Sequence, residues 1–89
     1  MYFLYNFWEA ALLLGALIKE GEHAQSKADF LNKMNVALKE AFESEYWIQH
    51  LRDSEYLSIE ESLSILSDVS ELIKLLARIV KSTKKSLEK

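Results

Sequence analysis

The chain has 89 residues, of which 49% are apolar, and its formal net charge is −3. A chain of this length forms one domain with a small core, so we treat residues 1–89 as a single helical-bundle domain. The absence of cysteine excludes disulfides, cysteine nucleophiles and cysteine metal ligands, and the negative charge argues against a general nucleic-acid binder. With no proline and only two glycines, the composition favours helices over a turn-rich β fold.

The first predicted helix covers residues 2–20 and is apolar nearly all round. Only Asn6 and Glu9 are strongly polar before Lys19. A membrane anchor over Met1–Ile18 has nearly the ~20 apolar residues that a span needs, although Glu9 would then lie near the membrane centre. A signal peptide would need a basic start, which the first nine residues lack. We favour a helix buried in a bundle or a subunit interface, and the membrane anchor is the alternative.

The second predicted helix, residues 26–53, is the longest uninterrupted helical pattern. Ser26 stands in N-cap position, and Asp29 favours the positive end of the helix dipole. Because the apolar arc covers about half the circumference, we expect this helix to contact two neighbours. One stripe of the arc contains Phe30, Met34, Ala37, Ala41, Ile48 and Leu51, and the stripe beside it contains Leu31, Leu38, Phe42 and Tyr46.

The third predicted helix covers residues 58–86 and begins with a capping box formed by Ser58 and Glu61. Gly21 ends the first helix, and short connections make consecutive helices antiparallel neighbours. The predicted fold class is therefore all-α, an antiparallel up-down bundle of three helices. The apolar seam of the third helix contains Ile59, Leu63, Leu66, Val69, Ile73, Leu76 and Val80.

The apolar arcs of these helices are too broad for three helices to cover. We therefore expect the bundle to complete its core by forming a homo-oligomer, with an interface of ordinary size, about 800 Å² per subunit. The candidate interface residues are Phe3, Phe7, Trp8, Leu12, Phe42, Tyr46, Leu72, Leu75 and Ile79.

No catalytic, cofactor-binding or metal-binding residues stand out. Glu20 and His23 have the Glu-x-x-His spacing of bundle di-iron sites, but such sites need two of these motifs and two further glutamates. His50 lies near the end of the second helix, where the helix dipole alone favours it. The sequence therefore predicts a protein that is not an enzyme and carries no cofactor.

Glu45 lies within the apolar arc of the second helix, and a buried carboxylate needs a partner. We expect an ion pair across helices or subunits, for instance with Arg52 or Arg78. Acid–base catalysis by this residue is disfavoured, because no matched second carboxylate is visible.

Basic residues gather near the C-terminus on one face of the third helix. They are Lys74, Arg78, Lys81 and Lys85, with Lys84 beside them. A stripe of this kind can follow phosphates, so it is a candidate RNA-contact surface. No aromatic residue is interleaved with the stripe, so a solvated helix end is the simpler interpretation, and an acidic protein partner is a third one.

Several segments resemble one bacterial protein family. The most specific motifs are Ser-Lys-Ala-Asp-Phe at 26–30, Lys-Glu-Ala at 39–41 and Glu-Ser-x-Tyr-Trp at 43–47. Similar stretches occur at 15–21, 36–38, 71–76 and 79–82. On these residues the chain resembles the bacterial four-helix bundle proteins that are encoded in intervening sequences of large-subunit ribosomal RNA genes.

The resemblance implies a small cytoplasmic helical protein that assembles as a homo-oligomer, commonly a pentamer, and for which binding to ribosomal RNA has been suggested. The resemblance implies no catalytic residues. Residues 15–86 are family-like, whereas residues 1–14 replace the family's first helix with an unrelated aromatic-rich run. We therefore expect a member that lacks this helix. The predicted function is that of a non-enzymatic interaction or scaffold protein, whose partners are its own copies and, as candidates, RNA or a nucleic-acid-processing protein.

Overall fold

The computed structural model describes the backbone of residues 2–88 and the side chains of residues 5–88. It contains α1 (Tyr2–Gly21), α2 (Lys27–Asp53) and α3 (Ile59–Leu87), and no strand within the described residues. The predicted helix bounds are confirmed to within about one residue. The all-α, three-helix fold class is confirmed as well.

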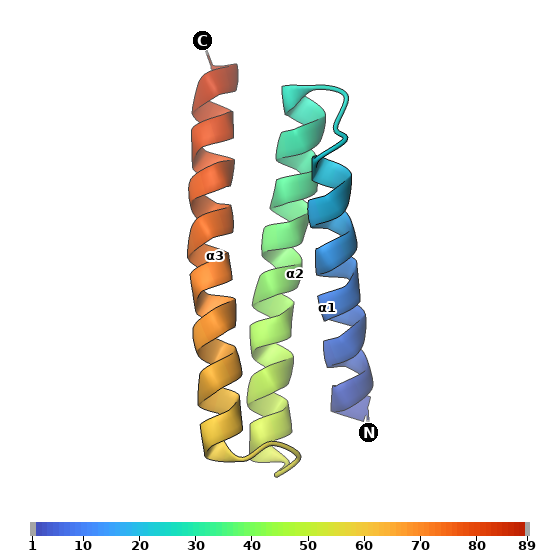
Figure 1. Cartoon of the computed structure of the whole chain (residues 1–89), viewed down its shortest axis with the longest axis vertical. Coiled ribbons are helices and arrows are strands. Elements are labelled where there is room, and N and C mark those ends of the chain that lie inside the picture. The colour runs from blue at the N-terminus through green and yellow to red at the C-terminus, as the bar shows by residue number, and fades with distance from the viewer. Residues whose placement is uncertain (1, 89) are drawn as a thin grey trace.

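The three helices run alternately up and down, with α2 between α1 and α3 (Figure 1). Both outer helices pack along α2. Within the described residues, no Cα atom of α1 comes within 8 Å of one in α3. The resulting rod extends 48 × 19 × 14 Å. The prediction that the other two helices pack around residues 26–53 is therefore confirmed.

Local capping explains where the helices begin and end. The Ser26 hydroxyl accepts a hydrogen bond from the Asp29 backbone N–H at 3.1 Å, which starts α2. Ser58 and Glu61 form the predicted capping box, with both hydrogen bonds at 3.0 Å. The bond from the Ser58 backbone N–H also holds the pKa of the Glu61 carboxyl below its ordinary value. Just beyond α2, Glu55 adopts a φ of 64°, a left-handed conformation that turns the chain toward α3.

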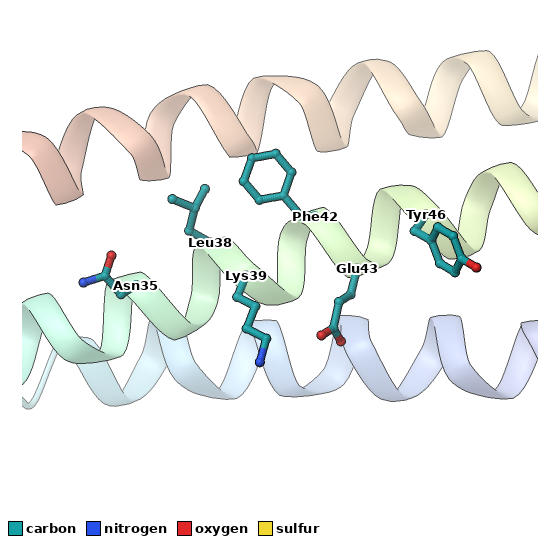
Figure 2. Close-up of a pocket in the computed structure, with 6 residues that line it drawn as sticks. All are labelled: Asn35, Leu38, Lys39, Phe42, Glu43 and Tyr46. Carbon is teal, nitrogen blue, oxygen red and sulfur yellow. The ribbon is translucent and has the colours of Figure 1, made fainter.

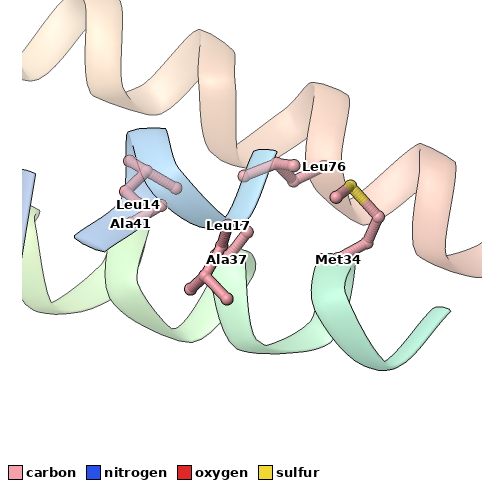
Figure 3. Packing of buried hydrophobic residues seen from close by; sticks show 6 residues of the cluster. All are labelled: Leu14, Leu17, Met34, Ala37, Ala41 and Leu76. Carbon is pink, nitrogen blue, oxygen red and sulfur yellow. The ribbon is translucent and has the colours of Figure 1, made fainter. Parts of the chain in front are cut away.

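The core cluster lies where both outer helices meet α2. Its buried members are Leu14 and Leu17 from α1, Met34, Ala37 and Ala41 from α2, and Leu76 from α3 (Figure 3). The small side chains of Ala37 and Ala41 at the centre of the cluster allow α1 and α3 to approach α2 closely. The predicted first stripe of α2 is confirmed from Met34 to Leu51, and Phe30 is half-buried.

The three helices leave part of the broad apolar arcs uncovered within a single chain, as expected. The second stripe of α2 is not covered, because Leu31 and Leu38 are half-buried and Phe42 and Tyr46 are exposed. The predicted seam of α3 is wrong at its start, where Ile59 and Leu63 face solvent. Among the described residues, no Cα atom of α1 approaches one of α3 within 8 Å, so each outer helix buries mainly the strip that faces α2 and leaves the rest of its apolar arc open.

Candidate interaction surfaces

The predicted basic residues form a continuous exposed stripe on α3. All five side chains are exposed, from Lys74 to Lys85, while Leu76 on the opposite side of the helix is buried. Asp68 and Glu71 border the beginning of this stripe, in a shallow depression that also includes Lys74 and Arg78. The positive charge is therefore strongest toward the C-terminal end of α3.

A sixth cation, Lys27, which the sequence analysis did not assign to the stripe, lies at the same end of the bundle. Its Nζ donates a hydrogen bond to the Ser86 hydroxyl at 2.7 Å, and Ser86 belongs to the last turn of α3. Because α2 begins where α3 ends, the first residue of α2 adds to the positive charge there. Sequence spacing along a single helix could not reveal this contact.

The predicted oligomer-interface residues lie on several faces of the rod. On α1, Trp8 and Leu12 are 57% and 70% exposed, and Tyr5, which the sequence analysis missed, extends the same face with 69% exposure. Phe42 and Tyr46 project from α2, and Leu75 projects from α3. Phe7, Leu72 and Ile79 are half-buried, and the side chain of Phe3 lies outside the described residues.

The face of α2 that points away from the core forms a shallow apolar depression. We call it the outer face of α2 and define it by Asn35, Leu38, Lys39, Phe42, Glu43 and Tyr46 (Figure 2). Its volume is about 520 Å³, and no described residue of α1 or α3 lines it. Figure 2 shows Lys39 and Glu43 along one edge, on the side of α1, and Leu38 and Phe42 toward α3.

The buried carboxylate in the structure is that of Glu40, not that of Glu45. Glu40 lies beside Glu43 and near Glu9 of α1, in a depression that also contains Asn6 and Trp47. Burial raises the pKa of the Glu40 carboxyl, and a hydrogen bond to Glu43 together with the charges of Glu43 and Glu9 raises it further. The spacing of Glu40 from the buried Ala37 and Ser44, three and four residues away, is the signal that could have found it.

The intrachain ion pair predicted for Glu45 is absent from the described residues. Arg52 Nε instead contacts the Asp53 carboxylate at 3.3 Å, and Arg78 Nε donates to the Lys74 carbonyl at 3.4 Å. Glu45 is half-buried and its carboxylate can reach solvent, so it does not require a partner within the chain.

Glu40→Gln is expected to stabilise the protein at pH 7, by up to about 1 kcal/mol, because it removes a charge from a buried site. Since folding raises the Glu40 pKa, this group opposes folding when ionised, and its unfavourable contribution fades as the pH falls through the folded-state pKa. Urea unfolding of both proteins at pH 7 and pH 5 measures this. The gain should shrink at pH 5, and the exposed control Glu71→Gln should show no comparable change. A Glu40→Gln variant less stable than the parent at pH 7 would contradict the assignment.

The described residues contain no group of three or more His, Cys, Asp or Glu side chains arranged to hold a metal ion. Glu20 and His23 lie at the end of α1, where the His23 backbone N–H donates to the Glu20 carbonyl. Among the described residues, no helix combines the length and apolar character that crossing a membrane requires.

No curated protein matches the chain. Among solved structures, it is similar to a crystal structure from Bacteroides thetaiotaomicron, described as a protein of unknown function from the S23 ribosomal protein family. The two are 44% identical with a TM-score of 0.87, and the alignment covers 91% of this chain and 75% of the other. The family match begins at Phe7, so residues 7–14, more than half of the segment that we expected to depart from the family, lie within it. On this match, over residues 7–78, the chain belongs to the 23S rRNA-intervening sequence protein family.

Proposed function

We propose that the protein is a non-enzymatic, cytoplasmic interaction protein that works as a homo-oligomer. The observation that carries this proposal is the number of large apolar side chains left in solvent on all three helices. Isolated exposed apolar residues are normal in monomers, whereas contiguous ones mark interaction sites. On α1, Tyr5, Trp8 and Leu12 are spaced three and four residues apart, which aligns them on one face as helix-binding surfaces require.

The oligomeric state in solution tests this proposal directly. Size-exclusion chromatography with light scattering at about 10 to 100 μM should give a mass of at least two chains, consistent with ordinary specific interfaces. The variant Trp8→Asp/Leu12→Asp should lower that mass or raise the dissociation constant about tenfold or more, because it places charge in a buried contact. Ser64→Asp, at an exposed position of α3, is the control. A folded parent protein that stays monomeric across this range would exclude the proposal.

We also propose that the basic stripe of α3 contacts RNA. Two observations favour it: the five cations are exposed together, and the family takes its name from intervening sequences of 23S rRNA. Lysine and arginine side chains on an open helix face can neutralise phosphates without reading bases. This contact should depend little on the RNA sequence, because no aromatic residue lies among the basic side chains to stack on bases.

Charge reversal distinguishes an RNA-binding stripe from a merely solvated helix end. Lys81→Glu/Lys85→Glu should weaken binding to a 23S rRNA fragment about tenfold or more, and should lower the slope of log affinity against log salt by about 2. Lys19→Glu, on α1, is the control and should leave that slope unchanged. Binding measured by fluorescence anisotropy between 50 and 200 mM salt tests both variants. If the double variant bound as the parent does, the stripe would not be the contact surface.

A further inference from the structure

A shallow groove runs along the C-terminal part of α3, on the side next to the start of α2. It consists of two depressions that share Ser82 and Thr83. The first depression extends from these residues to Arg78, and the second extends from them to Ser86 and to Lys27 of α2. Figure 1 shows the end of α3 beside the start of α2. We call this surface the hydroxyl groove and define it by these five residues.

The groove is continuous with the basic stripe of α3, because Arg78 belongs to both. Arg78, Ser82 and Ser86 are spaced four residues apart, so they form a row that winds slowly around the helix. This row begins on the stripe and ends where Ser86 accepts a hydrogen bond from Lys27 Nζ at 2.7 Å. A ligand that follows the stripe can therefore cross the end of the bundle to α2 without leaving a polar surface.

The hydroxyl groups of the groove are available to donate hydrogen bonds. Within the part of the chain that the structure describes, the side chains of Ser82 and Thr83 form no hydrogen bond. The Ser86 oxygen accepts from Lys27, so its O–H group can donate elsewhere. No Asp or Glu is among the described residues that line the two depressions. The groove therefore suits a ligand that brings acceptors and negative charge.

One cation stands at each end of the groove. Arg78 Nε donates to a carbonyl of its own helix at 3.4 Å, which orients the guanidinium and leaves its other nitrogens for a ligand. Lys27 is exposed and has no ion pair with another described residue. The nearby carboxylate of Asp29 instead lies 4.0 Å from Lys33 Nζ. Eight residues of α3 separate Arg78 from Ser86, so the two ends are about 12 Å apart along the helix axis.

We propose that the hydroxyl groove binds phosphates of an RNA backbone that passes from the basic stripe across the end of the bundle to α2. This inference rests on the proposed RNA contact and adds a second surface to it, on another helix. Phosphate oxygens only accept hydrogen bonds, so they match the hydroxyl donors, and an arginine can bind two oxygens of one phosphate. Phe30 lines the second depression but packs against the core cluster, so we expect phosphate contacts and no base stacking.

Charge reversal at Lys27 tests the α2 end of the groove. Lys27→Glu should weaken binding to the 23S rRNA fragment about fivefold or more, and should lower the slope of log affinity against log salt by about 1, because one phosphate contact is lost. Lys39→Glu is the matched control, since it makes the same charge change on the same helix, on the side of α1 (Figure 2). It should leave the slope unchanged. Equal effects of the two variants would overturn the groove.

Removal of the hydroxyls tests the middle of the groove without changing the charge. Ser82→Ala/Thr83→Val should weaken binding about threefold or more and leave the salt slope unchanged, because neutral donors displace no counterions. Ser64→Ala/Ser67→Ala, at exposed positions nearer the start of α3, is the control and should bind as the parent does. Circular dichroism verifies that each variant folds. A Ser82→Ala/Thr83→Val variant with the parent's affinity would overturn the inference.

The outcomes separate the groove from the basic stripe on which it rests. A parent protein that binds no RNA would reject both surfaces. If Lys81→Glu/Lys85→Glu weakened binding while Lys27→Glu matched its control, only the groove would be rejected. If Lys27→Glu alone weakened binding, the groove would be supported and the stripe rejected. A polyglutamate that displaced the RNA as well as a polyphosphate of equal charge would assign the groove to an acidic protein, and would overturn the phosphate contact.

Discussion

Leu76→Ala is expected to lower the free energy of unfolding by about 3 kcal/mol. Leu76 is 2% exposed, and it is the only buried apolar side chain of α3 within the described residues. It contacts the cluster formed by Leu14 and Leu17 of α1 and Met34 of α2, so it is the point where α3 joins the common core (Figure 3). Its truncation removes apolar burial and leaves a cavity that three rigid helices cannot fill.

Chemical denaturation followed by circular dichroism measures this loss, at a fixed protein concentration because association adds to apparent stability. Leu63→Ala is the matched control on the same helix. Leu63 is 58% exposed, so its truncation should change the free energy of unfolding by less than about 0.5 kcal/mol. Similar losses at both positions would mean that Leu76 does not join α3 to the core.

Ala41→Leu is expected to destabilise the fold by about 1 to 3 kcal/mol, although it adds apolar volume. Ala41 is 0% exposed and lies in the core cluster between the two outer helices. A leucine there must displace a neighbouring helix or adopt a poor rotamer, because the packed interior has no space for three more carbons.

Thermal unfolding detects this effect as a melting temperature about 5 to 20 °C lower, at roughly 4 to 8 °C per kcal/mol for a domain of this size. Ala77→Leu on α3 is the same chemical change at an exposed position, and should leave the melting temperature almost unchanged. A more stable Ala41→Leu variant would show that α1 and α3 are not held close to α2 at this position.

Local sequence signals predicted the helices because each signal acts within one turn of the chain. The Ser26 cap, the Ser58–Glu61 capping box and the end of α1 at Gly21 all appear where expected. Gly21 also lies against α2: a Cβ there would be 2.6 Å from Met34 Cε, so a larger residue would require the Met34 side chain to shift. The turn after α2 was harder to predict from the sequence, because Glu55 takes a left-handed conformation that glycine or asparagine usually adopts.

Buried polar residues were harder to predict because their burial depends on contacts between helices. Ser44 and Ser62 are almost completely buried, and each hydroxyl donates to a carbonyl of its own helix, at 2.9 Å to Glu40 and 2.8 Å to Ile59. Such self-contained hydrogen bonds allow a small polar residue to occupy a close helix contact. For candidate site residues, the sequence identified the basic stripe and most exposed aromatic residues, but not the contribution of Lys27 or the burial of Glu40.

The sequence by itself determined three helices, their antiparallel order and the position of the basic face, because these follow from caps, short loops and a period of 3.6 residues. Only the tertiary structure decided which part of each apolar arc is covered. Periodicity gives the direction of a face but not the number or position of the helices that meet it. Here α1 and α3 both pack along α2, and no described Cα atom of α1 lies within 8 Å of one in α3, so Ala37 and Ala41 are enclosed while Phe42 and Leu63 remain in solvent.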